Sequence, residues 1–113
     1  MDFSANEMTH EVTLNLEGKQ IVLLASLARL AELQQRVEAE GLGETIKMIQ
    51  LLDARVLLAG LVALSGSKNA DAFNDVHASV PVMQMVAGAL ASALTLGMPE
   101  PGADRGNGEA PTN

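Results

Sequence analysis

A few side chains in this sequence lie at spacings that could support chemistry. Asp71, Asp75 and His77 fall close together, which could suggest a divalent metal site or an acid–base arrangement. On a helix, however, positions 71 and 75 share a face, whereas position 77 does not. We therefore interpret them as the charged first turn of a helix with a histidine nearby.

The other polar candidates are isolated from one another. Ser79 and Ser92 have no base at a spacing that would activate a hydroxyl group. Asp53 and Arg55 interrupt an apolar stretch, where they could form an interface charge pair; alternatively, both bond locally or reach solvent. The sequence thus predicts no catalytic residue, no metal site, no cofactor and no enzymatic activity.

Composition excludes further classes of protein. A chain of 113 residues forms at most one domain, and without cysteine it has no disulfide, thiol nucleophile or cysteine-ligated zinc. A formal net charge of −7 opposes binding to nucleic acid or to anionic lipid. The N-terminal residues have neither the basic nor the apolar segment of a secretory signal, so we expect a cytoplasmic protein.

The segment from Val76 to Pro99 carries no formally charged side chain. Its length would suit a membrane span, but Pro81, Gln84 and Gly88 lie within it and acidic residues border it. We therefore disfavour a membrane span. The segment is expected to be buried in the fold, against another chain, or both.

Helices are expected to dominate the fold. Apolar residues at helical spacing predict helices over 19–40 and 44–64. Asn69 is a suitable cap for a third helix. Pro81 should break or kink that helix, so that its second piece spans 81–97.

One N-terminal segment has two open interpretations. Apolar and polar residues alternate over 11–17, which suits either a short strand or an extended segment packed on the helices. No other segment is a convincing partner strand. The sequence predicts an all-α fold, a small three- to four-helix bundle with at most this one strand. It comprises a flexible N-terminus at 1–10, a helical domain at 11–98 and a disordered tail at 99–113.

Two of the predicted helices are apolar on nearly every face and need more cover than a small bundle supplies. They are the second half of 44–64 and the helix after Pro81. An intertwined homodimer with a pooled core would provide the missing cover. The candidate protein-interface residues are Val56, Leu57, Leu61, Met83, Met85, Gly88, Leu90 and Leu94.

Lack of catalytic apparatus, high apolar content and an acidic surface favour a small interaction protein. We expect a non-enzymatic module that binds a partner protein and regulates it by inhibition, for example an antiactivator-type binder of a transcription regulator. The alternatives are a structural or accessory subunit of a larger assembly and a membrane-associated accessory protein. An enzyme with a pocket at a dimer interface would have few polar groups available. The expected partners are a second copy and another protein, and not nucleic acid.

Overall fold

A computed structural model describes residues 2–67 and 69–96 of the chain. Within these residues the elements are β1 (Asp2–Asn6), β2 (Glu11–Leu16), β3 (Lys19–Leu24), α1 (Leu27–Val37), α2 (Leu42–Gln50), α3 (Ala54–Ser65), the 3₁₀ turn η1 (Ala70–Phe73) and α4 (Val80–Leu96). The prediction of an all-α bundle is therefore wrong. The fold is α/β, with an antiparallel sheet of order β1-β2-β3 packed against the helices.

The turn at Glu17 and Gly18 explains why a sheet forms where a single strand was expected. Both residues have positive φ angles, 49° and 84°, as a two-residue type I′ hairpin turn requires. The chain therefore reverses and β3 pairs with β2. The strand interpretation of 11–17 is confirmed, and the expectation that it has no partner strand is wrong.

The first predicted helix is shorter than expected because its first six residues form β3. Ile21 and Leu23 are buried and alternate with exposed neighbours, which is the periodicity of a strand. α1 begins only after Ser26, whose hydroxyl oxygen accepts a hydrogen bond from the backbone N–H of Arg29. Glu38 ends α1 in a left-handed conformation.

The N-terminal residues, expected to be flexible, contribute the outer strand β1. Phe3 is half-buried and lies against α4, where a Cβ atom added to Gly88 would approach the Phe3 ring to 3.1 Å. Asn6 organises the loop to β2, because its side-chain oxygen accepts hydrogen bonds from the backbone N–H groups of Met8 and Thr9. An aromatic contact and a capped loop therefore hold this strand on the fold.

The second predicted helix divides into α2 and α3 at Leu52. The φ of this residue is 58°, in the left-handed region, and a right-handed helix ends at such a residue. Asp53 follows and caps α3, because its carboxylate accepts a hydrogen bond of 2.9 Å from the backbone N–H of Arg55. Aspartate before an apolar helical run is a strong capping residue. Asp53 could therefore have been recognised in the sequence as the start of a new helix.

The break predicted at Pro81 is confirmed, although it lies at the start of α4 and kinks no helix. Pro81 occupies the first turn, where a missing N–H leaves no hydrogen bond unmade. Ser79 caps this turn with its carbonyl and hydroxyl oxygens. The helix expected before Pro81 is reduced to η1, which Asn69 caps as predicted. The predicted tail at 99–113 lies outside the described residues.

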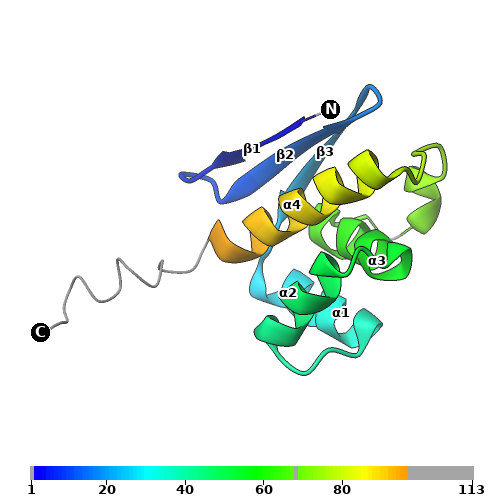
Figure 1. Cartoon of the computed structure of the whole chain (residues 1–113). Coiled ribbons are helices and arrows are strands. Elements are labelled where there is room, and N and C mark those ends of the chain that lie inside the picture. Colours follow the sequence, from blue (N-terminus) through cyan, green and yellow to red (C-terminus); the bar gives the residue numbers. More distant parts are fainter. Residues whose placement is uncertain (1, 68, 97–113) are drawn as a thin grey trace, which may run out of the picture.

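α4 is the central element of the fold. In Figure 1 the sheet lies along one side of α4, and α1, α2 and α3 lie on the other. Ala89 and Leu90 of α4 are fully buried, so the chain's own sheet and helices cover much of the charge-free segment. This internal cover removes the reason for which an intertwined homodimer with a pooled core was expected, and the homodimer itself stays a prediction. No helix in the described part of the chain combines the length and hydropathy that a bilayer crossing needs.

Candidate functional site

An apolar hollow lies between α3, α4 and the connector that joins η1 to α4. Its volume is about 190 Å³. Pockets for drug-sized ligands begin at roughly 300 Å³, whereas a cavity of about 150 Å³ admits benzene. The hollow is therefore large enough for one or two apolar side chains.

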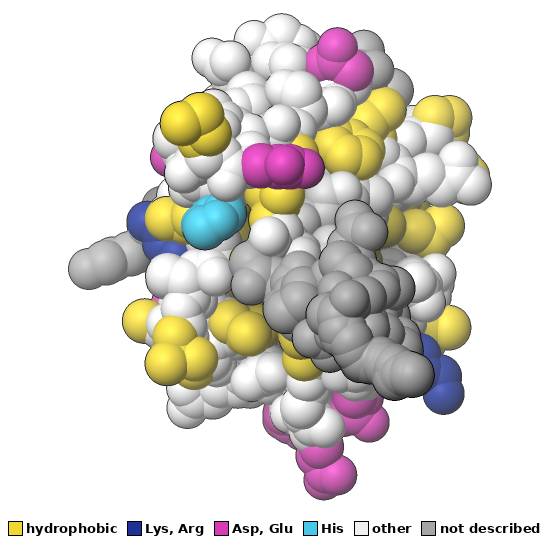
Figure 2. Space-filling model, turned by 90° about the vertical axis from the view of Figure 1, so that its left-hand side faces the viewer, with side chains coloured by type: hydrophobic (Ala, Val, Ile, Leu, Met, Phe, Trp, Pro, Cys, Tyr) yellow, Lys and Arg dark blue, Asp and Glu magenta, His cyan; other side chains and the backbone are white. Residues whose placement is uncertain are grey.

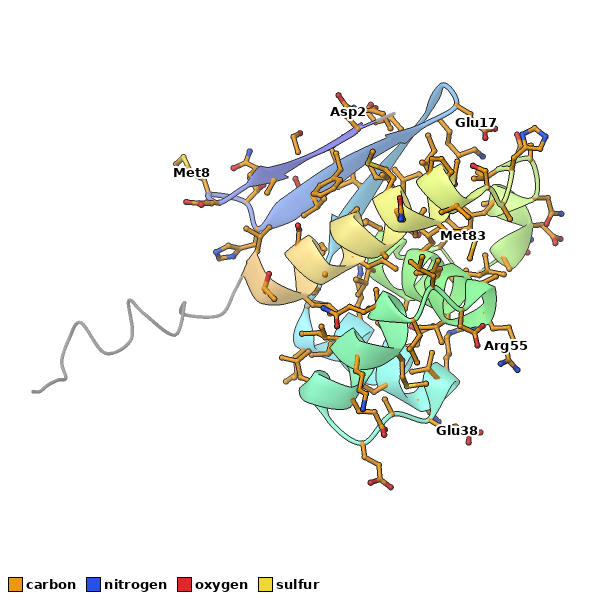
Figure 3. The ribbon with its side chains drawn as sticks, viewed as in Figure 1. Asp2, Met8, Glu17, Glu38, Arg55 and Met83 are labelled. Carbon is orange, nitrogen blue, oxygen red and sulfur yellow. The ribbon has the colours of Figure 1, made fainter. Side chains whose placement is uncertain are left out.

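Two helices form the walls of the hollow. On α3, Leu57 and Leu61 are buried and lie one helical turn apart, while Leu58 beside them keeps 39% of its surface exposed. On α4, Met83 is half-buried and projects toward α3 (Figure 3). The hollow thus has a fixed apolar interior, with Leu58 exposed at its edge.

The connector closes one end of the hollow and is tied to the sheet. His77 contributes the one ionisable side chain of the lining. Its Nδ1 lies 3.2 Å from Oε1 of Glu17, and its backbone N–H donates to Oε2 of the same carboxylate at 3.3 Å. Lys19 forms an ion pair of 3.7 Å with Asp75 and donates a hydrogen bond to the carbonyl oxygen of Ala72. These contacts, which are largely exposed, join the β2–β3 hairpin to the connector beside the hollow.

The three side chains first considered for chemistry do not converge on a site. Asp75 pairs with Lys19 and His77 with Glu17, whereas Asp71 bonds within its own turn. Among residues 2–67 and 69–96, no group of three or more His, Cys, Asp or Glu side chains is arranged to hold a metal ion.

Asp53 and Arg55 bond to each other at the start of α3, as the local interpretation expects. Arg55 donates from Nη2 to Oδ2 of Asp53 at 2.8 Å and from Nε to Oδ1 at 3.2 Å. These side-chain hydrogen bonds, together with one from the Arg55 backbone N–H, lower the pKa of Asp53 from 3.8 to about 2. The same hydrogen bonds raise the pKa of Arg55, whose side chain extends away from the fold (Figure 3).

We expect the stabilisation that Asp53 provides to be lost in acid. Because its pKa is lower in the folded chain, the unfolded chain takes up a proton first as the pH falls. The contribution is therefore full above pH 3.8 and disappears as the pH falls toward about 2. Asp53→Asn keeps a capping oxygen but has no titrating carboxylate, so it should flatten the pH dependence of the unfolding free energy in this window.

Urea denaturation at a series of acidic pH values measures this slope. Glu7→Gln is the control, because Glu7 is an exposed acid without an ion pair in the described part of the chain, and this variant should keep the wild-type slope. An Asp53→Asn variant with the wild-type slope would contradict this account of the α3 cap.

The predicted interface residues separate into a group at the hollow and a group inside the fold. Leu57, Leu61 and Met83 line the hollow. The others pack within the fold: Val56, Met85, Gly88, Leu90 and Leu94. The sequence did not identify Leu58, Phe73 or Val76 as lining residues. Leu58 could have been found from its place in the apolar run of α3. Phe73 and Val76 line the hollow only because η1 and the connector after it fold back beside α3 and α4.

The exposed large apolar side chains outside the hollow come from separate elements of the described chain, and they are Met8, Val22, Leu27, Leu51 and Val80. Figure 2 shows the face at the C-terminal end of α4, where the visible hydrophobic side chains of the described residues lie in separate groups among polar atoms. Leu51, with 71% of its surface exposed, lies at the end of α2 and does not line the hollow.

Comparisons with known proteins find no family model, no curated protein and no solved structure that matches this chain.

Proposed function

We propose that the protein is a non-enzymatic protein-interaction module, and that its hollow between α3 and α4 receives apolar side chains of a partner protein. The observation that carries this proposal is the chemistry of the lining. All the lining side chains except His77 are apolar, and His77 is engaged by Glu17. A site for a reaction or for a polar small molecule needs several convergent polar groups, which this lining does not offer.

The walls of the hollow suit an anchor-type interface. Apolar anchors seated in a pocket supply most of the binding free energy at many interfaces. Met83 adds a flexible, polarizable side chain that adapts to the shape of an anchor. Two leucine-sized anchors would contribute about 3–6 kcal/mol on burial, so stable binding needs further contacts around the hollow.

For the biological role, we propose that binding inhibits the partner by occupying a surface that it needs, as an antiactivator does with a transcription regulator. The net charge of −7 supports a protein partner over nucleic acid. The absence of cysteine, and hence of disulfides, suits a reducing compartment, and we propose a cytoplasmic location on that basis. An accessory role in a larger assembly is the alternative, and it is supported by the outer edge of β1, with which no strand pairs in the described part of the chain.

Leu58→Lys should strongly weaken partner binding without unfolding the protein. Because Leu58 is partly exposed, the lysine ammonium group can reach solvent while its stem stays at the edge of the hollow. A charge there opposes entry of an apolar anchor, and we expect capture of the partner to fall by about tenfold or more, as for a hot-spot residue. Affinity purification of the full chain from its native cells, with partners quantified by mass spectrometry, measures this fall.

Leu51→Lys provides the matched control, because it places the same charge on an exposed leucine away from the hollow. It should capture the partner as well as the wild type does, and both variants should unfold at the wild-type temperature. Equal capture by Leu58→Lys and wild type would refute the role of the hollow. Recovery of no stoichiometric protein partner by the wild type would refute the interaction function itself.

A further inference from the structure

β1 leaves one edge of the sheet open. It is the outer strand, and among the described residues no strand pairs with its outer edge. Natural proteins commonly protect such edges with lysine, proline, a bulge or an inward-pointing charge. The β1 sequence DFSAN contains no lysine or proline, and Phe3 and Ala5 are the side chains on its core-facing side. Apart from the charge of Asp2 at its first residue, this edge therefore lacks the usual protection against pairing.

The alternation of an antiparallel ladder identifies the free backbone groups of β1. Residues that flank a two-residue hairpin turn form a hydrogen-bonded pair, and hydrogen-bonded pairs then alternate along and across the sheet. Counted from the β2–β3 turn, Ser4 and Thr13 form a hydrogen-bonded pair between β1 and β2. The N–H and C=O groups of Phe3 and Ala5 consequently point away from β2.

We propose that β1 pairs with β1 of a second copy, antiparallel about a twofold axis at Ser4, so that two three-stranded sheets join edge to edge. In this register Phe3 lies opposite Ala5 of the second copy, and their free backbone groups can exchange hydrogen bonds. The register pairs all five residues of the strand. A shift by two residues in either direction would pair only residues 2–4 or 4–6.

The side chains of β1 are compatible with a second copy as the occupant of this edge. Asp2 lies opposite Asn6 of the second copy in this register, so a carboxylate meets a carboxamide and no acid in β1 faces another acid. On the neighbouring helix α4, Gln84 and Thr95 are exposed and uncharged. The edge-to-edge dimer leaves each core within its own chain. It also leaves the hollow free, because no sheet residue lines the hollow, so this proposal does not depend on the proposed function.

Exchanging the charge at the two ends of β1 tests the register. Asn6→Asp places two acids opposite each other at both symmetric sites, which should weaken dimerisation about tenfold. Adding Asp2→Asn puts an amide opposite the acid again and should restore the wild-type dissociation constant. Both substitutions keep an oxygen acceptor for the internal hydrogen bonds of Asp2 and Asn6, so the monomer fold is preserved. Sedimentation equilibrium of the full chain measures the dissociation constant of the dimer for the wild type and both variants. A monomeric wild type overturns the proposal, as does a double variant that dimerises no more tightly than Asn6→Asp.

A cysteine cross-link gives a second readout that does not depend on affinity. The chain has no cysteine, so Ser4→Cys introduces one thiol per copy. Across the twofold axis the two residues form a non-hydrogen-bonded pair with Cα atoms about 4.5 Å apart, within the range of a disulfide. Thr13→Cys is the control, because it lies opposite Ser4 on the same face of the sheet, yet its copies would be about 14 Å apart. Cross-linking of Ser4→Cys alone under mild oxidation supports the dimer, whereas no cross-link, or equal cross-linking of both variants, overturns it.

Discussion

Replacing Leu90 with aspartate should leave the chain unfolded. Leu90 is fully buried in α4, and α4 itself carries no charged side chain that could pair with a carboxylate. Loss of the leucine contacts costs about 2–5 kcal/mol, and burial of an unpaired charge costs several kcal/mol more. Together these costs reach the roughly 5–15 kcal/mol that stabilises a typical domain.

Gln84→Asp controls for the effect of adding an acid to α4. Gln84 lies on the exposed side of the helix, so its replacement should retain a cooperative unfolding transition close to that of the wild type. Far-UV circular dichroism and urea denaturation compare the two variants. If Leu90→Asp unfolds at the wild-type urea concentration, α4 is not the centre of the core.

Gly60→Ala should be strongly destabilising, although alanine favours helices over glycine by about 0.5–1 kcal/mol. A Cβ atom at position 60 of α3 would lie 2.7 Å from Cδ1 and 3.1 Å from Cδ2 of Leu90. Because Leu90 is enclosed by its neighbours, it cannot move aside without displacing them. We expect a net loss of about 1–3 kcal/mol, as for other overpacked cores.

A double-mutant cycle with Leu90→Ala tests whether this contact is the cause. Shortening residue 90 removes the atoms that clash, so the cost of the double variant should be lower than the sum of the single costs by about 1–2 kcal/mol. Urea denaturation supplies all four free energies. Gly43→Ala is the control, because a Cβ atom there meets nothing within 4 Å and its φ is not positive, so it should be neutral or stabilising. Strictly additive costs at positions 60 and 90 would contradict the close contact between α3 and α4.

The sheet was only partly predictable from the sequence. The alternation in 11–17 identified the central strand, because its buried and exposed residues differ clearly in polarity. Ile21 and Leu23 of β3 fit a strand, but Leu23 also fits the helical stripe that runs on into α1. Recognising Glu17-Gly18 as a type I′ turn would have separated the two interpretations. β1 could not be found from its own pattern, because it has only Phe3 and Ala5 to place on the core and owes its position to pairing with β2.

The missing sheet also explains why a pooled core was expected from the sequence. The apolar second half of α3 and the apolar helix α4 were identified correctly as needing cover on several faces. Without β3 and β1, a second chain was the obvious source of that cover. In the structure, α4 packs between the sheet and the other helices, so the cover comes from within one chain.

The hollow was predictable where helix periodicity alone brings residues together. Leu57 and Leu61 share a stripe of α3, and Met83 was singled out as an adaptable apolar residue. Phe73 and His77 lie at the hollow because Lys19 and Glu17 tie the connector to the hairpin. Such long-range polar contacts leave no periodic pattern in a sequence.

Photo-cross-linking in the native cells tests the proposed function most directly. A benzophenone amino acid replaces Leu58 at the edge of the hollow in one variant of the full chain, and replaces Leu51 in a second variant. We predict that position 58 cross-links to one protein partner, identified by mass spectrometry, and that position 51 does not. No protein cross-linked at position 58, or the same proteins cross-linked at both positions, would contradict a binding role for the hollow between α3 and α4.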